Sequence, residues 1–188
     1  MSKVSDIVKS VAKYLAMDEL LAAMDAGQTL SGELLAEQND LVRCVNIAAA
    51  DIALCVSAPT DYKLCTSIKG GIFYSDVDDN LIEVFDVRNE SGKKVSYTVY
   101  SDRVLVEDGR YYVYFSYSPG KLTLTREVPF SQVICLRALP YAVCAEYCVA
   151  VGLNGEAAKW HALFEKEREK IVNKKPRPAG IMSARRWF

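Results

Sequence analysis

Apolar residues recur at every third or fourth position near both ends of the chain, whereas the middle alternates apolar and polar residues. The first helical pattern starts at Ser5, whose hydroxyl can cap a helix, and stops before Gly27. Its apolar positions are Ile7, Val8, Val11, Leu15, Leu20, Leu21 and Met24. We therefore expect a single helix over residues 5–24.

A second helical pattern covers residues 31–57 and ends ahead of Pro59, which cannot continue a helix. Its apolar positions are separated by three, four or seven residues, as one face of a helix requires. They are Leu34, Leu41, Cys44, Ala48, Ile52 and Cys55. This spacing predicts a long helix that packs one side onto a core.

The period changes between about residues 62 and 117, where β-branched and aromatic residues alternate with polar ones. Turn sequences such as KGG, DVDDN, NESGK and EDG separate these runs, so we expect five or six strands. Two hairpins are predicted. One turns at the NESGK segment after Val84–Val87, and the other turns at Asp108–Gly109.

One of these strands is strongly aromatic, with Tyr111, Tyr112, Tyr114 and Tyr117. An aromatic row on a strand is typical of cross-strand packing. Surfaces that stack on nucleic-acid bases also use aromatic rows, but they combine them with basic residues. Because no basic residue interleaves with these tyrosines in the sequence, packing is the favoured interpretation.

Helical spacing returns after Pro119–Gly120. A third helix is expected from Arg137 or Pro140 to Val151, because proline is tolerated near a helix start. A fourth helix is expected over residues 156–172, after Asn154 as its N-cap. The apolar seams are Tyr141, Cys144, Cys148 and Val151 in the third helix and Ala157, Trp160, Phe164 and Ile171 in the fourth.

These patterns together predict an α+β protein. A bundle of about four helices, formed by residues 1–60 and 119–173, is interrupted by a β-rich insertion over residues 61–118. Residues 174–188 contain two prolines and no apolar periodicity, so we expect an extended, basic C-terminal tail.

The net charge of -1 conceals an uneven distribution over the 188 residues. From Lys170 onward there are six basic residues and no acidic one, and the chain before Lys170 has 17 basic and 24 acidic residues, a net charge of -7. An acidic body with a basic tail indicates a tail that binds an acidic partner or a nucleic acid.

The longest apolar stretch is interrupted by Glu146 and is shorter than the ~20 residues of a membrane span. We expect no membrane association.

Residues that could carry chemistry are few. None of the six cysteines lies in a CxxC pair, which favours reduced, buried thiols in a reducing compartment. A metal site could be imagined from Cys144, Cys148 and the single histidine, His161. Buried thiols are the favoured interpretation, however, and we expect no metal. No glycine-rich phosphate loop is present, and no nucleophile, base and orienting group can be assembled. We therefore expect no cofactor, no catalytic residue and a structural or binding role.

Six segments carry a resemblance to a known family when they are read in order. They are LVRCVNIAAADIA, GGIFYSDV, IEVFDVRNESGKKVSY, GRYYVYFSYSPGKLTL, AEYCVAVGLNGEAAKWHALFEK and the terminal RRWF. In this succession, which covers nearly the whole chain, the protein resembles the head–tail connectors, or adaptors, of tailed phages and prophages from Gram-positive hosts.

The resemblance implies a helical bundle with a β-rich insertion that forms a ring of twelve copies beneath the portal. Such a ring continues the DNA channel and links the capsid to the tail. The implied partners are the portal protein, neighbouring copies, a tail or tube protein below, and double-stranded DNA that passes without sequence-specific binding. The implied location is the neck of the virion, and the host cytoplasm during assembly. No DNA-contacting residue is carried over.

In connectors of this type the C-terminal segment reaches out and docks on the portal, which gives the tail a role. Prolines extend it, arginines can pair with carboxylates, and buried tryptophan and arginine often dominate the energy of an interface. The candidate partner-binding residues are Arg177, Arg185, Arg186, Trp187 and Phe188. A disordered tail, or one folded back on its own bundle, is the alternative.

Other functions stay open. The chain could be another phage tail or neck component, such as a terminator or tube protein, or a nucleic-acid-binding protein that uses its basic tail. The acidic body favours a connector, because a specific DNA-binding protein is expected to be basic over its folded face.

Overall fold

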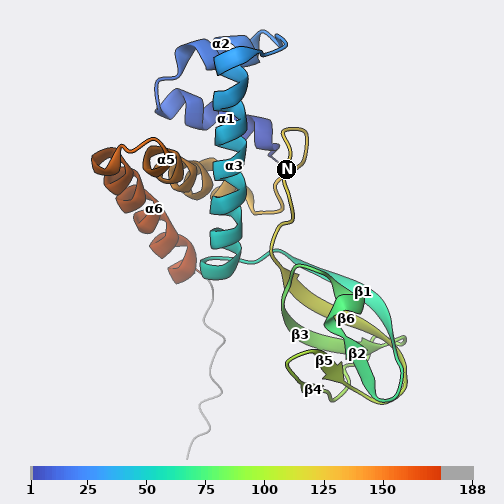
Figure 1. Cartoon of the computed structure of the whole chain (residues 1–188). Helices are drawn as coiled ribbons and strands as arrows, with labels where there is room; N and C mark the ends of the chain where they lie inside the picture. Colours follow the sequence, from blue (N-terminus) through green and yellow to red (C-terminus); the bar gives the residue numbers. More distant parts are fainter. Residues whose placement is uncertain (1, 175–188) are drawn as a thin grey trace, which may run out of the picture.

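The computed structural model describes residues 2–174 and has the expected α+β architecture (Figure 1). The helices are α1 (Val4–Tyr14), α2 (Asp18–Asp25), α3 (Gly32–Cys55), the short α4 (Tyr74–Val77), the π-helix η1 (Ile134–Ala138), α5 (Leu139–Ala150) and α6 (Asn154–Lys174). The strands are β1 (Thr60–Ser67), β2 (Gly71–Phe73), β3 (Leu81–Asn89), β4 (Thr98–Val99), β5 (Arg103–Leu105) and β6 (Gly109–Tyr117). The prediction of five or six strands is confirmed.

The expectation of one helix over residues 5–24 is wrong, because the chain turns sharply between α1 and α2. Ala16 has a φ of 54°, in the left-handed region that interrupts an α-helix. The Met17 N–H donates instead to the Ala12 carbonyl oxygen, at 2.9 Å. The break lets the side chain of Leu20, from α2, be fully buried in the same core as α1.

The other predicted helices are present with small shifts in their ends. The second runs as α3 from Gly32 to Cys55, and the fourth runs as α6. The third, α5, continues directly from the π-helical turn η1, and Pro140 lies in its first turn as expected. Two seam residues were assigned wrongly: Cys55 is exposed at the end of α3, and Val151, which follows the last residue of α5, is 49% exposed.

The helices share one core around α3. α1 and α5 both pack on α3, and α6 packs mainly on α5 and η1 (Figure 1). Tyr14, Tyr141 and Trp160 meet with ring centroids 5.6–5.9 Å apart, and this cluster ties α6 to α1 and α5. The largest fully buried side chains of this core are Leu20, Leu41, Ile52, Leu139, Val4, Val8, Val11 and Val45.

The strands form two three-stranded antiparallel sheets, with orders β1-β6-β3 and β2-β5-β4. The hairpin predicted at Asp108–Gly109 is wrong, because β5 and β6 belong to different sheets. The predicted NESGK turn exists, with Asn89 N–H donating to the Lys93 carbonyl oxygen at 3.0 Å. Beyond the bridge between Arg88 and Lys94, however, the chain leaves β3 and forms β4 against β5.

The strands have a core of their own, which lies apart from the helical core in Figure 1. It consists of Cys65, Ile72, Val77, Val84, Val87, Val104, Val106, Tyr111, Val113 and Phe115. After β6, the chain returns to the helices through Leu122, which is held by Asn46 of α3. The protein therefore has two cores joined by chain segments that cross between α3 and the strands.

Candidate interaction surfaces

The five tail residues proposed to bind a partner, Arg177, Arg185, Arg186, Trp187 and Phe188, lie outside the described residues. The structure shows the element that leads to them. α6 is a peripheral helix whose apolar residues Trp160, Phe164 and Ile171 are partly buried, and it extends to Lys174. The tail therefore starts from a regular helix on the outside of the helical core.

The three residues considered as metal ligands do not converge. The His161 side chain is 65% exposed, with Nε2 3.9 Å from Oε1 of Glu165, whereas Cys144 and Cys148 lie on the buried side of α5. Over residues 2–174, no group of three histidine, cysteine or acidic side chains is arranged to hold a metal ion. Within the same range, no helix is both long and apolar enough to cross a bilayer.

The thiols are poor nucleophiles where they are buried. Burial raises the pKa of Cys44 to about 11 and that of Cys144 to about 12, so both are protonated at neutral pH. Cys65, Cys135 and Cys148 are also buried, and burial raises the pKa of each. Cys55 is exposed at the end of α3, which the sequence pattern did not indicate.

Large apolar side chains are exposed at several places on the helical part, among them one side of α3 and the turn between α5 and α6. Ile47 and Leu54 of α3 are 44% and 66% exposed and lie on the side opposite the buried Ala48 and Ile52. A second group surrounds the turn between α5 and α6 and consists of Val149, Val151 and Leu153, each about half exposed. Exposed apolar groups of this kind mark contact surfaces when they gather in patches.

The β1-β6-β3 sheet carries an aromatic surface on the face turned away from its core. Tyr62 of β1 lies opposite Tyr114 of β6, and their ring centroids are 5.5 Å apart. Tyr62 also meets Tyr112 edge-on at 6.0 Å and remains 58% exposed. The guanidinium of Arg88, from β3, lies over the Tyr114 ring at 5.2 Å. We call Tyr62, Tyr112, Tyr114 and Arg88 the tyrosine–arginine face.

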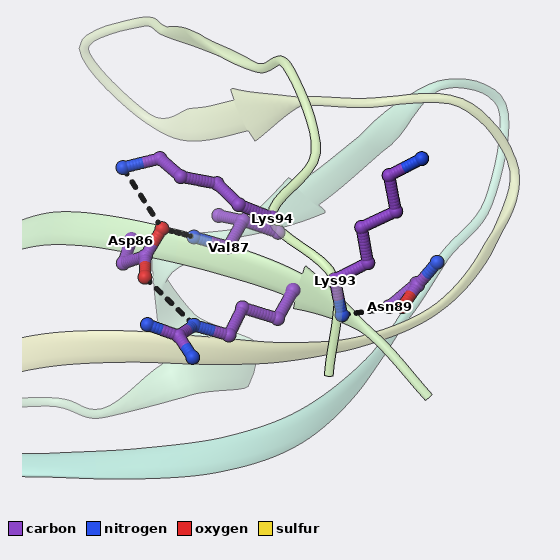
Figure 2. A network of polar contacts seen from close by, with 6 residues as sticks. Asp86, Val87, Asn89, Lys93 and Lys94 are labelled. Atoms are coloured by element: carbon purple, nitrogen blue, oxygen red, sulfur yellow. Dashed lines mark hydrogen bonds and ion pairs between the residues drawn. The ribbon is translucent and has the colours of Figure 1, made fainter. Parts of the chain in front are cut away.

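A carboxylate on the same side of the sheet fixes the arginine. Asp86 lies between two cations. Arg88 Nε donates to its Oδ2 at 2.9 Å, and Lys94 Nζ, which Figure 2 shows beside Asp86, lies 3.2 Å from its Oδ1. The Asp86 side chain is only 12% exposed, and it also accepts from its neighbouring Val87 N–H at 3.1 Å. The hydrogen bond from Arg88 and the nearby Lys94 hold the pKa of Asp86 below its ordinary value.

The basic residue that sequence reasoning did not find beside the tyrosines therefore comes from another strand. Arg88 lies opposite Tyr112 in the β3–β6 register, and Asp86 lies opposite Tyr114. Tyrosine and arginine, held rigidly and partly exposed, are the side chains that most often anchor protein interfaces.

Neither a scan against protein-family models nor a search among curated proteins found a match to the chain.

Proposed function

We propose that this protein is a structural component of a phage virion, the head–tail connector that forms a ring beneath the portal. In this role it links the capsid to the tail and continues the DNA channel, and it performs no catalysis. The proposal starts from the ordered resemblance to connectors over nearly the whole chain.

The observation that supports it best is the separation of two contact-bearing parts in one chain. The helical part exposes apolar residues on α3 and at the α5–α6 turn, and the strand part has its own core and the tyrosine–arginine face. An adaptor needs this division, because it must hold its neighbours, a partner above and a partner below at the same time. We assign the tail to the portal side and the tyrosine–arginine face to the tail or tube protein.

The charge distribution fits a channel that DNA slides through. The chain before Lys170 has a net charge of -7, which disfavours tight binding to phosphates. A wall that attracted phosphates strongly would retain the DNA that must pass. The six basic residues from Lys170 onward are available for acidic groups on the portal.

Two variants test the two sides of the adaptor separately. Truncation after Lys175 should leave the protein folded, because Ile171 is the last of the described residues that packs on the helical core. The truncated protein should fail to co-sediment with portal-containing heads, since each buried anchor of the tail contributes roughly 2 kcal/mol or more and many copies act together. A truncated protein that co-sediments like the intact one would refute the assignment of the tail.

The double substitution Tyr62→Ser/Tyr112→Ser should give the complementary defect. Heads should carry the protein but fail to acquire tails, because two of the three aromatic anchors of the tyrosine–arginine face are gone. Tyr100→Ser is the matched control, since Tyr100 is also an exposed tyrosine of the strand part, at 52%, but lies outside this face. Normal tail attachment by the double variant would refute the assignment of the face.

A further inference from the structure

One face of α3 carries apolar and acidic side chains that no other described segment covers. Ile47 and Leu54 are exposed on it, and Asp51 lies between them, one helical turn from each. Asp40 lies on the same face two turns before Ile47 and pairs with Arg43 at 3.3 Å, whereas Asp51 forms no ion pair with any residue of the described part. We call Asp40, Ile47, Asp51 and Leu54 the α3 stripe.

One flank of α6 has the opposite charge. Lys159, Leu163, Lys166 and Lys170 follow one another at steps of four, three and four residues, so they share one face; we call them the α6 stripe. Leu163 is 42% exposed, and the three lysines are exposed as well. Lys159 and Lys170 pair within the helix with Glu156 and Glu167, but Lys166 has no ion pair within residues 2–174.

The two stripes belong to different sides of the helical part. The α3 stripe lies on the face opposite Ala48 and Ile52, which point into the core shared with α1 and α5. α6 packs on α5 and η1, on the core side of α3, as Figure 1 shows. The α3 stripe of one chain therefore turns away from its own α6, and it can meet an α6 stripe only on a second copy.

We propose that the α3 stripe of each copy docks on the α6 stripe of the next copy, and that this contact builds the ring. The inference rests on the proposed connector function and names the contact surfaces. Ile47 and Leu54 pack beside Leu163, and Asp51 lies among the lysines, with Lys166 as the cation still free to pair with it.

Charge selects this pairing over its alternatives. Two α3 stripes facing each other would bring Asp51 against Asp51, and two α6 stripes would bring Lys166 against Lys166, whereas Lys159 and Lys170 are already paired with glutamates. Like charges across an interface suppress such pairings. A contact between two different surfaces of the same protein is heterologous, and it generates a closed ring when the rotation per copy closes.

Cross-linking through engineered cysteines tests the contact directly. The background is Cys55→Ser, because Cys55 is the exposed native thiol and the other five are buried. Asp51→Cys, Lys166→Cys and the double variant are treated with a flexible bismaleimide, both as concentrated isolated protein and in assembled particles. In assembled particles, the double variant should give a ladder that ends at a ring-sized product. Each single variant alone should give no dimer above background, and an equal mixture of the two should give dimers only.

Charge reversal gives a second, independent readout. Asp51→Lys and Lys166→Glu should each lower incorporation into particles, and the two changes in one chain should restore it, because the pair is again opposite in sign. Dimers formed by Asp51→Cys alone, or reversed charges that fail to rescue one another, would overturn the pairing of the stripes.

The outcome also separates this inference from the connector proposal. If the double cysteine variant enters particles but gives no cross-link, the stripe contact is refuted and the connector assignment stands. If the isolated protein gives the ladder but is absent from the neck of particles, the contact is supported and the connector assignment is refuted.

Discussion

Asn46 should be the polar side chain of α3 whose loss costs the most stability. Its Oδ1 accepts from the Leu122 N–H at 2.7 Å, and its Nδ2 donates to the Leu122 carbonyl oxygen at 3.1 Å and to the Val42 carbonyl oxygen at 2.8 Å. Leu122 is only 4% exposed, so water cannot readily replace these bonds. This clamp holds the chain where it returns from the strands to the helices.

Asn46→Leu keeps a side chain of similar size but removes all three hydrogen bonds. A buried backbone group left without a partner costs about 1–3 kcal/mol, and we expect a total loss of about 2–3 kcal/mol because Asn46 itself is only partly buried. For a chain of this size each kcal/mol shifts Tm by about 2–4 °C, so Tm should fall by about 4–12 °C.

Thermal unfolding followed by circular dichroism measures this shift. Asn39→Leu is the matched control, because Asn39 lies on the same helix but is exposed, and an exposed substitution should change stability by no more than about 0.5 kcal/mol. An Asn46→Leu protein that melts with the wild type would show that the clamp does not stabilise the fold. Equal losses in both variants would show that the loss at Asn46 does not come from its hydrogen bonds to Leu122 and Val42.

Two further predictions concern titratable groups. The folded-state pKa of Asp86 is lowered from 3.8, so its contribution to stability is present above pH 3.8 and is lost as the pH falls through the folded-state pKa. The Tm of Asp86→Asn should therefore lie below that of the wild type at pH 7 and converge with it in strong acid. A constant difference in Tm across the titration would contradict this prediction. A thiol reagent at pH 7 should modify one thiol per native chain, that of Cys55, because the other five cysteines are buried. After denaturation it should modify all six. Rapid modification of two or more thiols in the native protein would show that the helical or strand core opens.

The sequence predicted elements best where local signals agreed with the tertiary structure. α3 was recognised because its apolar face is continuous and Pro59 lies just beyond its end. The break between α1 and α2 was missed, because an alanine at Ala16 gives no sign of a left-handed conformation, and the apolar spacing continues through it. Only packing of Leu20 into the shared core shows why the chain turns there.

Strand pairing and the tyrosine–arginine face depended on contacts far apart in sequence. Asp108–Gly109 has good turn chemistry, yet the chain uses it to pass from one sheet to the other, since β6 finds its partners in β1 and β3. Arg88 was not seen as a neighbour of Tyr114 because 25 residues lie between them, and the β3–β6 register alone brings them together. A linear pattern shows a strand's own residues but not the strand beside it.

A ring of twelve copies between portal and tail is proposed for this protein, and electron microscopy of the neck tests it most directly. We predict a closed ring beneath the portal, with the helical part lining or bracing the channel, the strand part more peripheral, and the tail reaching the portal. We expect that the isolated protein can remain monomeric if the portal is the template for assembly. A closed dimer in the native complex, an arrangement other than a ring, or a neck without this protein would contradict the account.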